Sequence, residues 1–338
     1  MTHDSATPKA LVIYNPTAGT AVDIDMCLGA IVHNLCKQKQ YSVTVSPTKA
    51  GLGHRDAVDL IRGSYDLIVA AGGDGTIRLA LGAVSEAAPQ TPVAIIPLGT
   101  GNQLARNLKI YEENLLTDPL IEAINVMLRG RETRIDLGTM NGEYFCVAAG
   151  AGPISDAVIT PSRQEKANFK MLAYIGSMLQ TFALPPVVFR VKTGGDDFRV
   201  KASGVFVTNV ADLGVGTLSD TAEMNDGLLD LCIMNPGELF DYMQLGFRFA
   251  GGLLGGEAPY YIRKVTEVDL EVLPMKIQLS EFQAMAHKVR STLKGYPDEQ
   301  PEVMDQLTAM IDGDAYGETP MHIEVVPDAV SVMIPAHR

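Results

Sequence analysis

The stretch "IVAAGGDGTIRLAL" at residues 68–81 decides how this chain is interpreted. An apolar run from Ile68 to Ala71 ends at two glycines, and a helix-like pattern resumes after Asp74-Gly75-Thr76. A strand that ends in glycines and feeds a helix presents unpaired backbone N–H groups and the positive end of the helix dipole. Glycines also let an anion approach the backbone closely. The stretch therefore predicts a phosphate-binding turn after a buried strand.

Asp74 is the one charged residue in this turn. A carboxylate would repel a phosphate, so Asp74 would act through Mg²⁺ or by accepting a proton from an attacking hydroxyl. The alternative is a tight turn that uses Gly and Asp for their backbone freedom, with Asp74 capping the helix. Gly-Gly alone does not decide between these interpretations.

Short apolar strands alternate with helices over the first third of the chain. The predicted strands are 9–14, 41–45, 65–71 and 92–98, and the predicted helices are 24–38, 55–63, 75–87 and one that starts within 99–108. This alternation predicts an α/β domain, a Rossmann-like parallel sheet covered by helices on both faces.

The pattern changes from about residue 131, where a mostly antiparallel β-sandwich is expected. Strands are predicted within 131–150, with a hairpin at Met140-Asn141-Gly142, and at 187–193, 198–210, 227–234, "HIEVVP" and "VSVMIP". Helical patterns interrupt the strands at 165–183 and 237–254, and an insertion at about 275–310, including 280–295 and 302–313, also has a helical pattern. The expected domains are 1–130, completed by 328–338, and 131–327.

Length and composition limit the classes of protein. The 338 residues suggest two domains, and 46% apolar with 20% charged residues is typical of a soluble globular protein. A net charge of −13 argues against nucleic acid as a partner and against strong electrostatic docking on anionic lipid, although a local patch could still do this. Four cysteines without CxxC spacing indicate neither a zinc site nor a disulfide framework. With no signal peptide or membrane span expected, the predicted location is cytoplasmic.

Two more loops strengthen the phosphate-site interpretation. "YNPTAG" (14–19) follows the first predicted strand, and "PLGTGN" (97–102) follows the fourth. In a doubly wound sheet, these loops and the Gly-Gly turn emerge at the carboxyl edge, where ligands bind. Neither a Walker A sequence nor GxGxxG is present in them, which argues against a P-loop enzyme or an ordinary dinucleotide-binding dehydrogenase.

In their order and spacing, "NPTAG", "GGDGT" and "PLGTGN" resemble the catalytic domain of the diacylglycerol kinase, sphingosine kinase and bacterial lipid kinase family. The resemblance continues in "IDLGTMNGEYFCVAAGAG" (135–152), "MNDGLLDL" (224–231) and "IDGD" (311–314), and it covers roughly 9–273 and 310–335. GGDGT alone is shared with NAD kinases and phosphofructokinase-like folds, so the ordered set is what makes the match specific.

The resemblance implies a set of nucleotide contacts. The residues that match the family's ATP-binding positions are Asn15, Pro16, Gly19, Thr48, Gly72, Gly73, Asp74, Gly75, Thr76, Gly99, Thr100 and Asn102. Arg78 stands where the family usually has Asn. It could add positive charge to the nucleotide phosphates, or it could be an ordinary residue of the helix surface.

The resemblance also implies a Mg²⁺ site at the D-G-x-L segment. Here its ligands would be the Asp226 side chain and the backbone carbonyls of Glu223 and Leu228. Asn225-Asp226-Gly227 is also a common turn sequence, so a simple hairpin turn is the alternative.

The family's late "DGE" supplies the general base, and this chain has Asp312-Gly313-Asp314 there. Asp314 is one methylene shorter than the usual Glu, and reach matters because a base must come within about 3 Å of its proton. Asp312 and Asp74 would join it in a cluster bridged by Mg²⁺, and Asp136 matches an Asp of the same network. Without the resemblance, Asp136 would be a polar residue at a strand edge, and Asp312 to Asp314 a solvated turn.

Together these matches imply a kinase that uses ATP and Mg²⁺ to phosphorylate a lipid hydroxyl, with transient contact with the membrane surface and a homodimer as a further expectation. The apolar segments 171–189 and 242–256 could line a lipid groove, although Met and Leu at helical spacing more often pack in a core. The chain departs from the family's sequence pattern at Arg78-Leu79 and Gln103-Leu104, and it has an insertion before Asp312. The identity of the lipid that accepts the phosphate therefore stays open. The alternatives are a soluble-substrate kinase related to NAD kinase and a non-catalytic nucleotide-binding regulator.

Overall fold

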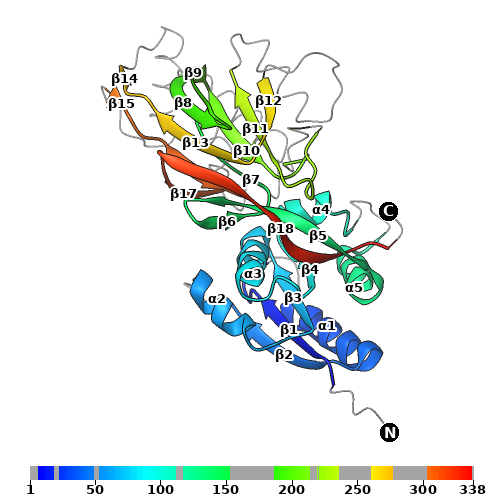
Figure 1. Cartoon of the computed structure of the whole chain (residues 1–338). Coiled ribbons are helices and arrows are strands. Elements are labelled where there is room, and N and C mark those ends of the chain that lie inside the picture. The colour runs from blue at the N-terminus through cyan, green and yellow to red at the C-terminus, as the bar shows by residue number, and fades with distance from the viewer. Residues whose placement is uncertain are drawn as a thin grey trace. The chain divides into compact units, whose positions relative to one another are not determined.

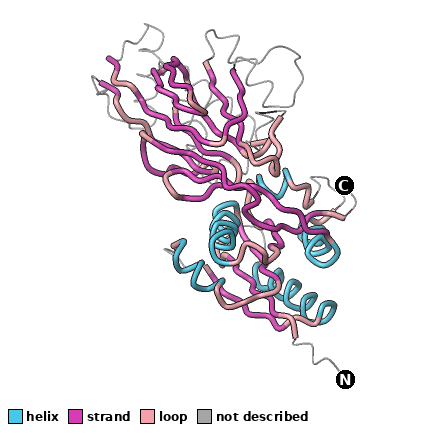
Figure 2. The backbone as a smooth tube through the Cα atoms, in the orientation of Figure 1, coloured by secondary structure: helices cyan, strands magenta, loops and turns pink. Residues whose placement is uncertain are grey.

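The fold is taken from a computed structural model of the chain (Figures 1 and 2). It describes residues 7–18, 23–48, 53–111, 117–152, 186–213, 219, 221–235, 260–276 and 303–336. The chain forms two compact units. Unit 1 comprises Met1–Leu137, Met224–Asp226 and Val326–Arg338, and unit 2 comprises Gly138–Glu223 and Gly227–Val325.

Unit 1 contains a parallel sheet with the strand order β2-β1-β3-β4-β18. Its strands are β1 (Lys9–Tyr14), β2 (Ser42–Pro47), β3 (Leu67–Gly72), β4 (Val93–Pro97) and the C-terminal part of β18 (Met321–Ile334). β3 and β4 are buried along their whole length. Their apolar runs do not alternate with polar residues because, in a parallel sheet, both faces are covered. The predicted α/β fold is therefore confirmed.

The helices of unit 1 begin at recognisable caps. They are α1 (Ile24–Lys39), α2 (His54–Ile61), α3 (Asp74–Ala87), α4 (Gln103–Asn107) and α5 (Pro119–Arg129). The Asp23 carboxylate accepts the backbone N–H groups of Asp25 and Met26 at the start of α1. Asp118 caps α5 in the same way, with Pro119 in the first turn. α5 was not among the predicted helices, although Asp118-Pro119 is a start signal.

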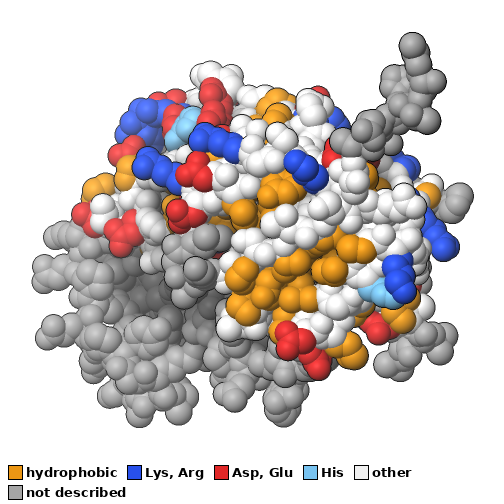
Figure 3. All heavy atoms as spheres, turned by 90° about the horizontal axis from the view of Figure 1, so that it is seen from below, with side chains coloured by type: hydrophobic (Ala, Val, Ile, Leu, Met, Phe, Trp, Pro, Cys, Tyr) orange, Lys and Arg blue, Asp and Glu red, His pale blue; other side chains and the backbone are white. Residues whose placement is uncertain are grey.

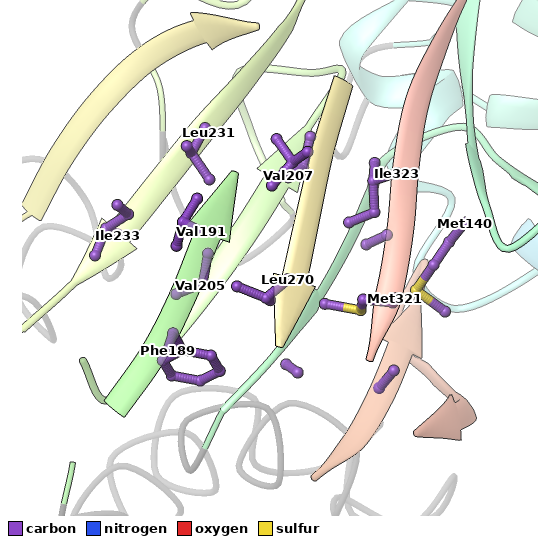
Figure 4. Close-up of a cluster of buried hydrophobic side chains, with 14 of the residues drawn as sticks. Met140, Phe189, Val191, Val205, Val207, Leu231, Ile233, Leu270, Met321 and Ile323 are labelled. Carbon is purple, nitrogen blue, oxygen red and sulfur yellow. The ribbon is translucent and has the colours of Figure 1, made fainter. Parts of the chain in front are cut away.

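The described strands of unit 2 are antiparallel, and most of them lie in two larger sheets. One has the order β18-β13-β8-β9 and the other β12-β11-β10-β7-β16-β17. The strands are β7 (Ala148–Ala151), β8 (Val187–Thr193), β9 (Asp196–Ala202), β10 (Gly204–Thr208), β11 (Leu229–Met234), β12 (Tyr260–Val265), β13 (Glu267–Val272), β16 (Thr308–Ile311) and β17 (Asp314–Glu318). Figure 4 shows side chains of both sheets, among them Phe189, Leu231 and Leu270, in one buried hydrophobic cluster. This is the predicted β-sandwich.

The hairpin predicted at Met140-Asn141-Gly142 is also confirmed. β5 (Arg131–Met140) pairs with β6 (Glu143–Phe145), and Met140 lies opposite Glu143. Asn141 and Gly142 have φ angles of 50° and 84°, so both central residues adopt the left-handed conformation that a tight hairpin requires.

The helical prediction for 302–313 was wrong. β15 (Val303–Met304) pairs with β14 (Met275–Lys276), and β16 joins the six-stranded sheet beside β7. The apolar spacing of this segment resembles that of a helix, but the backbone pairs with a strand distant in sequence. The helical patterns predicted at 165–183, 237–254 and 280–295 lie outside the described residues.

Two properties of the described residues bear on possible contact with membranes or nucleic acids. Within the described ranges, no helix is both long enough and apolar enough to cross a membrane. On the face drawn in Figure 3, the described Lys and Arg side chains are interspersed with Asp and Glu and do not form one continuous basic surface.

Candidate active site

The predicted phosphate loops of unit 1 lie side by side at the carboxyl edge of the sheet. The Asn15 N–H, after β1, donates to the Ala71 carbonyl at the end of β3 at 3.1 Å, and the Thr48 N–H, after β2, donates to the Tyr14 carbonyl at 2.7 Å. The Leu98 N–H, after β4, donates to the Gly72 carbonyl at 2.8 Å. The loops after all four strands are thus adjacent, as a doubly wound sheet requires.

Asn15 shapes the first of these loops. Its Oδ1 accepts the Thr17 backbone N–H and the Thr17 hydroxyl, both at 2.9 Å, and the Ala18 N–H donates to the Asn15 carbonyl at 3.1 Å. These bonds form an Asn-centred turn directly after the strand. Gly19, predicted to contact the nucleotide, lies outside the described residues.

Asp74 links the Gly-Gly turn to the third loop. Its Oδ2 accepts the Asn102 N–H at 2.9 Å and its Oδ1 accepts the Gln103 N–H at 2.8 Å. Asp74 is the first residue of α3, yet its carboxylate takes the first backbone donors of the neighbouring helix α4. One carboxylate therefore holds the GGDGT turn and the PLGTGN loop together.

Asn102 closes the third loop from the inside. It has a left-handed backbone with φ 50° and ψ 39°. Its Oδ1 accepts the Gly99 N–H at 2.9 Å, and its Nδ2 donates to the Gly99 carbonyl at 2.8 Å. The loop is fixed by its own side chain, and only 9% of Asn102 is exposed.

The loops approach each other so closely that glycine is required. A Cβ placed on Gly99 would lie 2.7 Å from the Gly73 Cα and 2.9 Å from the Asn102 Oδ1. A Cβ on Gly101 would lie 2.5 Å from the Asp74 Oδ2. The predicted glycines thus serve the contact between two loops, in addition to any approach of a ligand.

Two opposing effects act on the pKa of the Asp74 carboxyl. Burial raises the pKa of the Asp74 carboxyl above its ordinary value, while the hydrogen bonds from Gln103 and Asn102 and the positive charge of Arg106 oppose the rise. A divalent cation nearby would also favour the charged form.

Asp136 joins the predicted metal segment to unit 1. Its backbone N–H donates to the Met224 carbonyl at 2.6 Å, and its Oδ1 accepts the Asp328 N–H at 2.7 Å. Asp136 is 1% exposed, so it is a buried anchor and not a polar residue at a strand edge. Met224 to Asp226 belong to unit 1 through this attachment.

The predicted Mg²⁺ segment forms a turn before β11. Asp226 is half-buried, and Gly227 has a φ of 72°, a left-handed conformation that suits glycine. No cluster of three His, Cys, Asp or Glu side chains is found in the described part of the chain. The proposed set, one carboxylate with the carbonyls of Glu223 and Leu228, needs no such cluster. Its all-oxygen donors fit a hard cation.

Asp312 and Asp314 belong to unit 2 and have different surroundings. Asp312 is 9% exposed and forms, with Gly313, the turn between β16 and β17. Its Oδ2 accepts the Cys146 N–H at 3.0 Å, and its Oδ1 accepts the N–H groups of Val147 at 2.8 Å and Ala148 at 3.0 Å. Asp314 begins β17 and is exposed.

Known proteins match the part of the chain that contains these loops. Residues 9–140 match the family model described as the diacylglycerol kinase catalytic domain. The chain is 28% identical over 239 residues to a diacylglycerol kinase of Bacillus subtilis, covering 70% of this chain and 77% of the relative. It is 29% identical over 246 residues to one of Staphylococcus saprophyticus, covering 71% and 78%.

The chain is thus similar to diacylglycerol kinases, through its residues 9–140 and through these relatives. Its fold is similar to a crystal structure of a proposed diacylglycerol kinase from Bacillus anthracis, with a TM-score of 0.72 at 20% identity over 99% of this chain and 98% of the other. A second structure, of a diacylglycerol kinase from the same organism, gives a TM-score of 0.65 at 19% identity over 96% of each chain.

One departure from the diacylglycerol kinase family pattern has a structural explanation. Gln103 is one of the departures identified from the sequence, but the contact it makes with Asp74 uses its backbone N–H, which any residue other than proline supplies. The link between the two loops therefore does not depend on the Gln103 side chain. Arg78 lies half-buried on α3 and Thr100 lies in the third loop.

One buried carboxylate of unit 2 was not predicted. Asp230 on β11 is 1% exposed, and its Oδ1 accepts the hydroxyls of Ser219 at 2.9 Å and Thr221 at 2.8 Å. Lys264 on β12 lies 3.5 Å from its Oδ2. Asp230 thereby fixes the start of the segment that leads into the proposed metal turn. Its place in "DGLLDL", beside apolar residues of a buried strand, was the available signal.

Proposed function

We propose that this protein is an ATP- and Mg²⁺-dependent lipid kinase that transfers the γ-phosphoryl group of ATP to a lipid hydroxyl. The observation that carries the proposal is the contact between the GGDGT turn and the PLGTGN loop, where Asp74 accepts the N–H groups of Asn102 and Gln103. This contact holds two glycine loops at the carboxyl edge of a parallel sheet, where nucleotides bind in such folds.

The loops would bind the phosphates of ATP. Their glycines would let an anion approach the backbone closely, and the Asn15 turn lies beside them through its bond to Ala71. Phosphoryl transfer requires mainly positioning and charge stabilisation, which fits a site built from fixed backbone groups. Residues Gly72 to Thr76, Gly99, Thr100 and Asn102 are the proposed contacts.

The lipid hydroxyl that receives the phosphoryl group would need a residue that accepts its proton. We assign this role to Asp314, an exposed carboxylate at the start of β17. Mg²⁺, held by Asp226 with the carbonyls of Glu223 and Leu228, would neutralise charge on the transferred phosphate when bound. Asp136 keeps this segment attached to unit 1 through its bond to Met224.

The proposed acceptor is diacylglycerol or a lipid alcohol like it. The support is that the relatives from Bacillus subtilis and Staphylococcus saprophyticus are diacylglycerol kinases. Such a lipid resides in a bilayer, so transient contact with the membrane surface is part of the proposal.

The test is phosphate transfer from γ-labelled ATP with Mg²⁺ into mixed micelles that contain diacylglycerol, sphingosine or a total lipid extract. The proposal expects a labelled lipid with wild type, a loss of roughly a hundredfold or more with Asp314→Asn, and partial activity with Asp314→Glu. If no lipid is labelled while ATP still raises the melting temperature, the lipid kinase proposal fails. Label in a soluble acceptor would instead support a soluble-substrate kinase.

A further inference from the structure

Asp312 and Gly313 form the two-residue tip of the β16–β17 hairpin. Ile311 pairs with Asp314, and the two residues between them have φ angles of 50° and 86°. Left-handed conformations at both central positions are typical of a type I′ turn, for which Asp-Gly is a preferred sequence. The turn places Asp314 as the first residue after the tip.

The Asp312 side chain points back from this tip into a row of backbone donors. Its two oxygens accept the N–H groups of three consecutive residues, Cys146, Val147 and Ala148, at 2.8 to 3.0 Å. The Asp312 N–H in turn donates to the Ala148 carbonyl at 2.8 Å. Tip and segment are therefore joined by four hydrogen bonds.

The receiving segment is itself fixed by residues at the end of β10. The Val147 carbonyl accepts the Asn209 N–H at 2.9 Å and the Thr208 hydroxyl at 3.1 Å. The Cys146 carbonyl accepts from the Asn209 Nδ2 at 3.2 Å. Asp312 thus anchors the hairpin tip to a segment that is held from a third strand.

We propose that Asp312 is a positioning residue that sets the place of the Asp314 carboxylate, and that it takes no proton itself. The proposal rests on the proposed function, in which Asp314 is the base. Hydrogen bonds to a carboxylate stabilise its charged form and make it a poorer proton acceptor. Asp312 accepts three such bonds and is 9% exposed, whereas Asp314 is exposed.

Three substitutions separate the roles of the carboxylate and the turn. Asp312→Asn keeps an acceptor oxygen for Val147 and Ala148 and tolerates the left-handed backbone. It turns an amide toward the Cys146 N–H, so kcat is expected to fall by about tenfold or less. Asp312→Gly suits the turn but leaves three N–H groups without this acceptor, and kcat is expected to fall about a hundredfold. Asn141→Gly, in the equivalent turn of the β5–β6 hairpin, is the matched control and is expected to keep wild-type kcat.

The pH dependence of kcat distinguishes a residue that accepts the proton from a residue that only positions it. Asp312→Asn is expected to keep the acid limb of wild type, whereas Asp314→Asn is expected to lose it. The proposal is overturned if Asp312→Asn lowers kcat as much as Asp314→Asn does and removes the same limb.

Hydrogen exchange provides a readout without catalysis. In Asp312→Gly, the amides of Cys146 to Ala148 are expected to exchange at least tenfold faster than in wild type, with little change in Asn141→Gly. Unchanged exchange would contradict the anchoring role even if the enzyme proved inactive on every lipid. Failure of the proposed function and failure of this inference are thereby distinguishable.

Discussion

Substituting Gly99 by Ala should separate the two glycine loops of unit 1. The new Cβ would lie 2.7 Å from the Gly73 Cα, a backbone atom that no side-chain rotation can move away. Carbon atoms in contact are normally 3.5 to 4.0 Å apart. The loops would have to move apart by about 1 Å, which would strain the bonds of Asn102 to Gly99 and of Asn102 to Asp74.

The cost follows from the two effects combined. Forcing one extra methyl group into a packed site typically costs about 1 to 3 kcal/mol. Each weakened hydrogen bond adds about 0.5 to 1.5 kcal/mol. Gly99→Ala should therefore destabilise unit 1 by about 2 to 4 kcal/mol, or lower its melting temperature by roughly 5 to 15 °C at about 2 to 4 °C per kcal/mol.

The measurement is thermal unfolding followed by circular dichroism, with Gly29→Ala as the matched control. Gly29 lies within α1, and nothing is found within 4 Å of its added Cβ. There the same chemical change should stabilise the helix by roughly 0.5 to 1 kcal/mol. Nucleotide binding to Gly99→Ala, measured by the shift that ATP produces, should weaken as well. If Gly99→Ala unfolds at the wild-type temperature or above, the close loop contact is not a real constraint.

Three further predictions concern single side chains. Asn102→Ala should lower the free energy of unfolding, measured in urea, by about 2 to 3 kcal/mol. Asn102→Gly should relieve the strain of the left-handed backbone, but the two side-chain hydrogen bonds to Gly99 would still be lost. The hydrogen bond to Asp269 raises the pKa of His322, so this pair should stabilise unit 2 below about pH 6.5 and lose that effect as pH rises through the raised pKa. Because the pair is half-exposed, its contribution to the free energy of unfolding should be larger at pH 5.5 than at pH 8.5 by only a few tenths of a kcal/mol. This contribution should be absent in His322→Gln. Lys264→Met should destabilise unit 2 by about 1 to 3 kcal/mol, because the buried Asp230 loses its positive partner, whereas Lys264→Arg should be nearly neutral.

The α/β part of the fold could be predicted because local signals agree with the tertiary structure there. The strands β1, β3 and β4 are short apolar runs, and each strand of the first third is followed by a helix with a polar or glycine-containing start. The strand at Thr308–Ile311 could not be predicted in this way. Its pairing partner, Ala149–Ala151, lies more than 150 residues earlier in the chain, and the segment alone has helix-like apolar spacing.

The acidic residues show where sequence patterns reach their limit. Motifs identified Asp74, Asp136 and Asp312 as functional candidates, and in the structure each accepts backbone N–H groups from a segment distant in sequence. A motif records that a carboxylate is required at a position, but a base, a metal ligand and an anchor require the same side chain. Only the donors around the carboxylate distinguish them. Asp314, on an exposed strand, does not share the buried surroundings of Asp312. We therefore expect that substitutions at Asp312 act through the position of the hairpin, and that those at Asp314 act on the chemical step.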